Sequence, residues 1–223
     1  MNLITSNYMG ERETSKKIIV VGDGGCGKTC LLIKYTEDRF EKDHNVTVFE
    51  NKEVPYLDRA TGTTYMLNIW DTAGQDDFDR IRKLCYIDTQ LVLICFALNK
   101  PESFKNIEGR WKEEVDHFCK DVPRILVGMK ADLRKTTSED LISESMARQL
   151  ASSVSAKCYV ECSSVTGENV DTVFDEAMNV LLNRTKKRKT EAHRARRSSQ
   201  NIIKKKYWRS IIKGLGDKEL DMS

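Results

Sequence analysis

The sequence predicts an α/β fold with a mostly parallel central sheet, and three observations support that prediction. Short apolar runs at 18–21, 91–96 and 125–127 alternate with longer stretches of helical spacing, an order that places helices on both faces of a sheet. The run at 91–96 is continuously apolar, as expected of a strand that is covered on both faces. A glycine-rich turn at 22–29 joins the first strand to a helix, at the sheet edge where ligands of such folds bind.

The other elements follow from periodicity and turn residues. After a helix that extends to about Asp38, residues 48–57 and 63–70 predict two strands joined by a turn at 58–62, so that one edge strand is antiparallel. The polar segment 40–46 predicts a loop. The fold is completed by predicted helices at 103–118 and 143–152, a strand at 158–162, and a last helix with Val170, Val173, Phe174, Ala177 and Leu181 at core-facing spacing.

Residues 22–29 spell G-x-x-x-x-G-K-T, the pattern of a phosphate-binding loop between a strand and a helix. Glycines allow the backbone to wrap closely around a polyphosphate, with N–H groups and the helix N-terminus directed at the anion. Lys28 is predicted to reach the β- and γ-phosphates, and the Thr29 hydroxyl to bind Mg²⁺. The predicted nucleotide contacts of this segment are Gly22, Gly24, Gly25, Cys26, Gly27, Lys28, Thr29 and Cys30.

A second motif, W-D-T-A-G-Q at 70–75, follows the second strand of the hairpin. Asp71 is placed at a strand end, where its carboxylate can hold Mg²⁺ through water. Gly74 offers a backbone N–H to a γ-phosphate, and Gln75 can orient an attacking water. The two motifs together predict a nucleoside triphosphatase.

The cysteine content and the apolar runs indicate the cellular compartment in which the protein works. Seven cysteines without paired C-x-x-C spacing indicate free thiols in a reducing cytosol. Cys26 is a candidate redox-sensitive thiol, because a helix N-terminus favours the thiolate. The longest apolar run, 91–98, is too short to span a membrane.

These motifs resemble the Ras superfamily of small GTPases, and most of all its Rho/Rac branch. The segments that carry this similarity are 47–51 (T-V-F-E-N), 70–75, 79–82 (D-R-I-R), and Trp111 followed by 114–119 (E-V-D-H-F-C). The resemblance covers about 16–182 and implies a G domain of the phosphate-loop NTPase type. It further implies a switch that cycles between GTP and GDP with Mg²⁺, binds effectors in its GTP state and hydrolyses GTP slowly, in cytoskeletal or membrane signalling.

The resemblance also implies roles for particular residues. Thr47 would coordinate Mg²⁺ with Thr29 and Asp71, and Phe40 would pack near the base. Gln75 and Lys28 would be the catalytic residues. An exchange factor, a GTPase-activating protein and effectors would bind a monomer through the two switch segments, the second of which contains Gly74 and Gln75.

The chain departs from the family pattern where the base is read. The family's N-K-x-D is Met129-Lys130-Ala131-Asp132 here, and S-A-K is Ser163-Ser164-Val165. Asp132 can still accept from the guanine N1–H and amine, the stem of Lys130 can cover the base, and the Ser164 N–H can meet its O6. A thioether cannot replace the Asn amide, and Val165 lacks the Lys stem. We therefore expect guanine specificity with weaker binding. A pseudo-GTPase scaffold is the alternative, and Asp132 disfavours an ATP-dependent enzyme.

Two further departures concern the loops. His44 and Val46 replace the Tyr and Pro of the first switch, so we expect that loop to be more flexible. Only 14 residues separate Asp132 from Ala147, which leaves no room for the extra helix of most Rho proteins.

The sequence predicts a 1–15 extension, a 16–182 G domain and a basic 183–223 tail. The tail holds 14 basic and 4 acidic residues, whereas the rest of the chain holds 23 and 30. No cysteine follows Cys162, so no prenylation is expected. Residues 202–215 have the pattern of a basic amphipathic helix at an anionic membrane surface. A solvated tail and a nuclear-import signal are the alternatives, and a nucleic-acid partner is disfavoured. We expect a cytoplasmic protein, peripheral at a membrane or nuclear.

Overall fold

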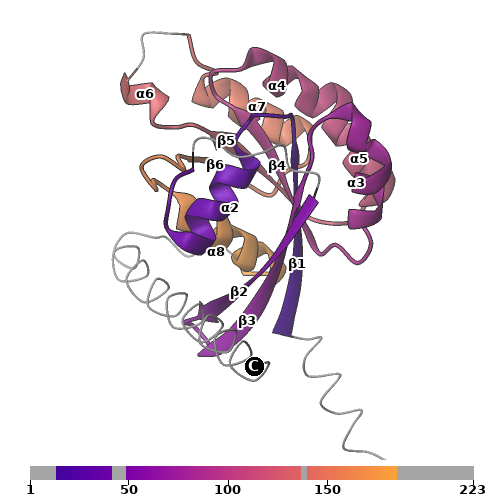
Figure 1. The fold of residues 1–223 in the computed structure, drawn as a ribbon, viewed down its shortest axis with the longest axis vertical. Helices are drawn as coiled ribbons and strands as arrows, with labels where there is room; N and C mark the ends of the chain where they lie inside the picture. The colour runs from indigo at the N-terminus through magenta and orange to yellow at the C-terminus, as the bar shows by residue number, and fades with distance from the viewer. Residues whose placement is uncertain (1–13, 42–48, 137–139, 185–223) are drawn as a thin grey trace, which may run out of the picture. The chain divides into compact units, whose positions relative to one another are not determined.

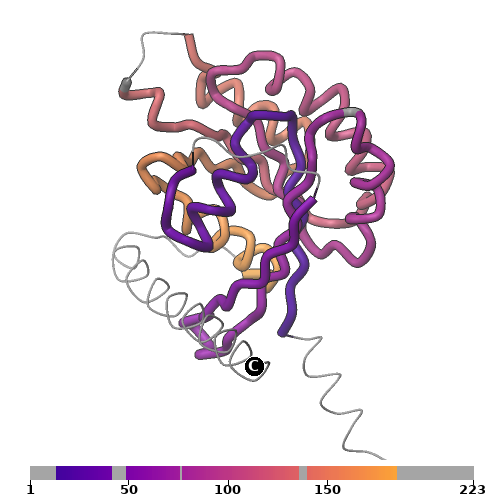
Figure 2. Tube along the Cα trace, viewed as in Figure 1, coloured from indigo at the N-terminus to yellow at the C-terminus, as the bar shows by residue number. Residues whose placement is uncertain are grey.

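The computed structural model describes residues 14–41, 49–136 and 140–184. It contains a six-stranded sheet with the order β2-β3-β1-β4-β5-β6. The pairs β1–β4, β4–β5 and β5–β6 are parallel, and the hairpin strands β2 and β3 form the antiparallel pair. The predicted mostly parallel α/β sheet with one antiparallel edge strand is therefore confirmed. Figure 2 follows the chain from β1 in indigo to the last helix in orange.

The strands are β1 (Ser15–Gly22), β2 (Phe49–Asp58), β3 (Thr63–Thr72), β4 (Leu91–Ala97), β5 (Arg124–Met129) and β6 (Tyr159–Cys162). The helices are α2 (Lys28–Glu37), α3 (Asp79–Cys85), α4 (Pro101–Asn106), α5 (Lys112–Phe118), α6 (Leu133–Thr136), α7 (Glu144–Ser153) and α8 (Val170–Leu181). A 3₁₀ turn, η1 (Asp76–Phe78), precedes α3, and a π-turn, η2 (Ile107–Trp111), joins α4 to α5. Sequence periodicity predicted neither α3 nor α6.

The described residues divide into two compact units, and the smaller comprises 14–16 and 53–67. Its centre is the hairpin turn between β2 and β3. The Asp58 carboxylate accepts from the Ala60 N–H at 3.2 Å and from the Thr61 hydroxyl at 2.5 Å. Gly62 has a φ of 72° and donates its N–H to the Asp58 carbonyl at 2.8 Å. The turn predicted at 58–62 thus depends on a side-chain cap and a left-handed glycine.

The larger unit holds the parallel strands and every helix of the described residues. Alternate residues of β1 and β4, such as Ile19 and Ile94, pack with α5 and α7 in one fully buried cluster. On the opposite face α2 and α8 lie together (Figure 1). Tyr35 of α2 stacks there on Phe174 of α8, with ring centroids 3.6 Å apart. Because both faces of β4 are covered, all seven of its residues are buried. Burial of this apolar area is the main force that holds the strand ends, and thus the site, in place.

The helix predicted at 103–118 differs from the structure in one respect. It begins at Pro101, a residue favoured in a first helical turn, and it contains the π-turn η2 in its middle. Hydrophobic spacing alone does not reveal this π-turn, because the buried residues Ile107, Trp111 and Val115 lie at intervals of four, which an ordinary α-helix also allows. None of the described helices is long and apolar enough to cross a membrane. Residues 1–13 of the predicted 1–15 extension and residues 185–223 of the predicted 183–223 tail lie outside the described residues, as do Thr47, His44 and Val46.

Candidate functional site

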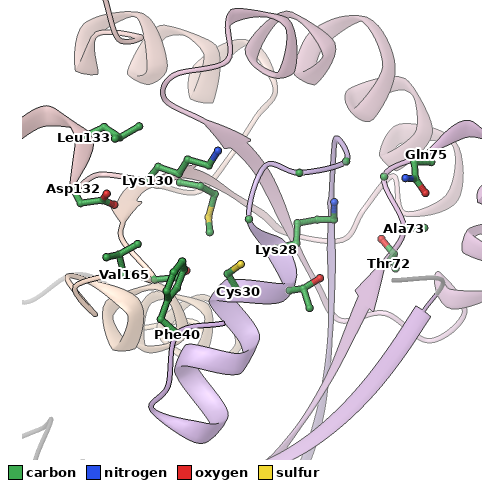
Figure 3. Close-up of a pocket in the computed structure, with 17 residues that line it drawn as sticks. Lys28, Cys30, Phe40, Thr72, Ala73, Gln75, Lys130, Asp132, Leu133 and Val165 are labelled. Atoms are coloured by element: carbon green, nitrogen blue, oxygen red, sulfur yellow. The ribbon is translucent and has the colours of Figure 1, made fainter. Parts of the chain in front are cut away.

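A cavity of about 500 Å³ lies at the carboxyl ends of the parallel strands. Figure 3 shows Lys28 near its middle, with Thr72, Ala73 and Gln75 toward one end and Lys130, Asp132 and Val165 toward the other. We call these the phosphate end and the base end. The lining residues are Gly24, Gly25, Gly27, Lys28, Thr29, Cys30, Phe40, Thr72, Ala73, Gly74, Gln75, Met129, Lys130, Asp132, Leu133, Ser164 and Val165.

The phosphate loop takes a path that only glycine allows at two positions. Gly22 has a φ of 142°, and a Cβ there would lie 2.2 Å from the Cys95 carbonyl oxygen. Gly27 has a φ of 109° and immediately precedes α2. Both conformations are in the region that L-residues avoid. The sequence therefore produces a tight loop that directs the N-terminus of α2 into the cavity.

The ammonium of Lys28 is buried and anchored by the loop itself. Its Nζ donates to the carbonyl oxygens of Gly22 at 2.7 Å and Asp23 at 2.9 Å. An ammonium has three donors, so these contacts leave capacity for a phosphate oxygen. A positive charge is thus held at the centre of the cavity in the position that the motif predicts.

Two predicted magnesium ligands meet at the phosphate end. Thr29 Oγ1 donates to Asp71 Oδ2 at 2.6 Å, although the residues are 42 positions apart. A hydroxyl with one carboxylate suits Mg²⁺, which keeps several waters and takes other ligands from substrate phosphates. No group of three or more His, Cys, Asp or Glu side chains that could hold a metal occurs in the described part of the chain. The Thr29–Asp71 pair therefore fits a Mg²⁺ ion that is bound together with a nucleotide.

The segment after β3 lies directly against the phosphate loop. The Thr72 hydroxyl donates to the Val20 carbonyl at 2.7 Å and fixes the end of the strand. A Cβ on Gly74 would lie 2.3 Å from the Gly22 carbonyl oxygen, so the two backbones touch. Gln75 is exposed, and its Cγ lies 3.6 Å from the position of a Cβ on Gly24. The residue that sequence analysis assigns to a catalytic water thus lines the cavity beside the loop.

The base end holds Asp132, Lys130 and Ser164, which sequence analysis assigns to the guanine base. Asp132 accepts a hydrogen bond from the Ser163 hydroxyl at 2.5 Å, which orients its carboxylate. Lys130 has a φ of 67°, and this bend directs the chain along the cavity wall. Phe40 lines the same end and is 42% exposed, so its ring has a free face for a base. These residues come from three separate segments of the sequence.

Met129 occupies the position of the family's Asn and packs as an apolar residue. It is 1% exposed, its Sδ lies 3.7 Å from Cys162 Sγ, and its Cε lies 3.4 Å from the position of a Cβ on Gly27. The buried atoms Asn99 Oδ1 and Ser164 Oγ have no hydrogen-bond partner within the described residues. Both follow the strands that flank β5, which ends at Met129. Buried polar groups are normally satisfied, and the Met129 thioether supplies no amide that could bond either atom.

Some predicted residues do not line the cavity. Gly22, Cys26, Asp71 and Ser163 lie behind the lining and support it. Cys26 is fully buried, and burial raises the pKa of its thiol, so the expected thiolate character was wrong. Thr72, Ala73 and Leu133 do line the cavity, and sequence analysis assigned them no role. Their positions in the sequence could have indicated this, because Thr72 and Ala73 lie within the motif 70–75 and Leu133 follows Asp132.

A glycine-rich loop with a buried lysine, a threonine–aspartate pair and a separate base-reading aspartate define a guanine-nucleotide-binding protein of the phosphate-loop class. A model of the Ras family matches residues 17–183. The chain belongs to that family and is a Rho-like small GTPase.

Three relatives support this assignment. The Rho-related GTP-binding protein RhoD of Homo sapiens is 45% identical over 177 residues, which cover 75% of this chain and 83% of that protein. The GTP-binding protein RHO1 of Candida albicans is 41% identical over 189 residues, or 81% and 94%. The GTP-binding protein rhoC of Emericella nidulans is 44% identical over 177 residues, or 75% of this chain but 63% of the relative. These similarities do not support the pseudo-GTPase alternative, and they imply regulators and effectors in general.

Proposed function

We propose that the chain alternates between GTP- and GDP-bound states and hydrolyses GTP by in-line attack of water at the phosphate end of the cavity. The observation that carries this proposal is the single cavity in which Lys28, Gln75 and Asp132 are brought together. Asp132 and Lys130 would select and cover the guanine base. Signalling in cytoskeletal or membrane pathways stays a prediction from the family resemblance.

The work of each residue follows from its position. Lys28 and the loop N–H groups would bind the β- and γ-phosphates, and Gln75 would orient the water. Thr29 and Asp71, with Thr47, would hold Mg²⁺, which neutralises charge on the phosphates when it is bound. Catalysis of this kind consists of positioning and electrostatic stabilisation.

A partner protein would supply further positive charge to stabilise the transition state of hydrolysis. The cations of the cavity lining are Lys28 and Lys130, and no arginine lines it in the described ranges. In other GTPases an inserted arginine raises the rate by about 10³–10⁵-fold. We therefore expect slow intrinsic hydrolysis, an activating partner that brings an arginine, and exchange factors and effectors that contact the segments around Thr47 and Gln75.

The test is single-turnover phosphate release from GTP-loaded protein. Gln75→Leu should remove most of the intrinsic rate, because leucine cannot hydrogen-bond the attacking water. Gln149→Leu, on the exposed side of α7, is the matched control and should leave the rate unchanged. Equal rates for the wild type and Gln75→Leu would refute the assigned role of Gln75.

We further propose that the 183–223 tail holds the protein at anionic membrane surfaces. The support is its charge and the apolar arc of 202–215 in the sequence. Each basic residue near such a surface contributes about 1 kcal/mol. Truncation at Asn183 should abolish sedimentation with phosphatidylserine-rich vesicles, and high salt should weaken it.

Two further variants separate charge from apolar insertion. Trp208→Ala with Ile212→Ala should weaken vesicle binding at low salt, and phosphatidylcholine vesicles are the control. Full-length protein that ignores anionic vesicles and accumulates in nuclei would replace the membrane proposal with the nuclear-import alternative.

A further inference from the structure

A fully buried arginine lies beside the phosphate end of the cavity. The side chain of Arg82, on α3, is 0% exposed. Its Nε and Nη2 each donate to one carboxylate oxygen of Glu114 at 2.7 Å, and Nη2 also reaches Asp79 at 2.5 Å. Burial lowers the pKa of the guanidinium, but the hydrogen bonds and charges of Glu114 and Asp79 outweigh that effect and raise it. The charge is therefore permanent, and the fork geometry fixes its direction.

The remaining nitrogen of this guanidinium holds the backbone of the catalytic segment. Arg82 Nη1 donates to the Ala73 carbonyl at 2.9 Å and, at 3.4 Å, to the Gln75 carbonyl. The Ala73 carbonyl and the Gly74 N–H belong to one planar trans peptide and point in opposite directions. A hydrogen bond that fixes this carbonyl therefore also fixes the direction of the Gly74 N–H. The second bond restrains the residue that carries the catalytic amide.

The helical segment α4–η2–α5, which carries Glu114, also binds the phosphate loop. The Trp111 indole N–H donates to Asp23 Oδ1 at 2.7 Å, and the Asn106 amide donates to Asp23 Oδ2 at 2.7 Å. The Trp111 ring centroid lies 4.8 Å from the Arg82 guanidinium. Both carboxylate oxygens of a loop residue are thus bound by the helical segment that also carries Glu114.

The π-turn η2 explains how one helix reaches Asp23 twice. Asn106 and Trp111 are five residues apart, which in an α-helix places them about 140° apart. A π-turn brings residues i and i+5 onto one face, so both side chains can bind the same carboxylate. π-turns inside α-helices occur frequently at functional sites.

We propose that Arg82 is a positioning residue for GTP hydrolysis, which holds the Ala73–Gly74 peptide and Gln75 in register with the phosphate loop through Glu114 and Trp111. The inference rests on the proposed function, because it assumes that Gly74 and Gln75 face the γ-phosphate. Since Arg82 does not line the cavity and its guanidinium donates to protein oxygens, its loss should affect the hydrolytic step more than nucleotide binding.

The experiment compares three variants of the full chain. Arg82→Lys keeps a charge but loses the fork, and Arg82→Met with Glu114→Gln removes both buried charges so that neither is left unpaired. Arg80→Met, at an exposed position of the same helix, is the matched control. Misplacement of reacting groups by about 1 Å can lower a rate by about 100-fold. We expect both Arg82 variants to lower single-turnover hydrolysis by about 10–100-fold, with GDP release changed by less than about threefold, and Arg80→Met to resemble the wild type.

Two readouts separate positioning from general stability. In a Gln75→Leu background, the Arg82 changes should lower the rate by a smaller factor than in the wild type, because residues that act as a unit are not additive. The ³¹P resonance of the γ-phosphate of a bound non-hydrolysable GTP analogue should shift in the Arg82 variants and not in Arg80→Met. Folded Arg82 variants with wild-type hydrolysis, or fully additive losses, would overturn this inference alone. A wild type without hydrolysis would overturn the proposed function as well.

Discussion

The two ends of the cavity differ in how their polar groups are held. At the phosphate end, hydrogen bonds within the protein anchor the Lys28 ammonium and the Thr29 hydroxyl. At the base end, the Met129 sulfur lies against the Cys162 sulfur, while Asn99 Oδ1 and Ser164 Oγ are buried without partners among the described residues. The phosphate end therefore holds the charged groups to which we assign phosphate binding, whereas the base end has a thioether in place of the amide of the family pattern.

The difference indicates that the rate of nucleotide release and the rate of GTP hydrolysis can vary separately in this protein. A charge contact to a phosphate contributes more free energy than a neutral hydrogen bond around a base. We accordingly expect substitutions at the phosphate end to abolish function and substitutions at the base end to tune nucleotide release.

The largest expected effect is at Lys28. Lys28→Ala should weaken GDP and GTP binding by at least about 3 kcal/mol, or more than about 100-fold, because it removes a buried cation from the polyphosphate. Isothermal titration with GDP measures the loss. Lys34→Ala, on the same helix but outside the cavity lining, is the control, and a similar loss there would argue against a specific phosphate contact.

Asp132 should carry the choice of base. Wild-type protein should ignore equimolar ATP in competition with a labelled guanine nucleotide. Asp132→Ala should lose about 2–3 kcal/mol of this preference, because two donors of guanine would then lack a charged acceptor. Competition by ATP at wild-type Asp132 would contradict the assignment of the base end.

Met129→Asn should strengthen the weaker end of the cavity. An amide near the ends of the flanking strands could bond Asn99 and Ser164, and satisfying buried polar groups is worth about 1–3 kcal/mol. Release of a fluorescent GDP analogue should then slow by about 5–150-fold. Met129→Leu conserves volume without an amide and should leave the rate nearly unchanged. If both variants behave alike, packing and not hydrogen bonding controls release.

The smallest expected effect is at Val165, which is 53% exposed at the rim of the base end. Val165→Lys should slow GDP release by only about two- to fivefold, since a lysine stem would cover one face of the base while its ammonium stays in water. Thr166→Lys adds the same charge at the neighbouring exposed position. Equal slowing by both variants would point to long-range attraction of the phosphates.

Much of the fold could be predicted because its signals are local. The apolar run of β4 and the glycine spacing of 22–29 depend on side-chain periodicity and backbone conformation, which adjacent residues determine. Most element ends differed by one or two residues from the predicted ones, and β1 begins three residues before the apolar run 18–21. The short helix α3 has a polar sequence (D-R-I-R-K-L-C) without a long apolar period, so its pattern did not predict it.

The sequence by itself determined the chemistry of the site: which residues can bind phosphate, hold Mg²⁺ and read guanine. The tertiary structure alone decided which polar groups became buried and with what partners. Arg82 belongs to a mostly charged segment without a core-facing period, yet its side chain is enclosed between Glu114 and the Ala73 carbonyl. The Trp111–Asp23 bond joins residues 88 positions apart. Such contacts depend on how helices and strands pack against one another. Local periodicity does not reveal them, because the partners are far apart in the sequence.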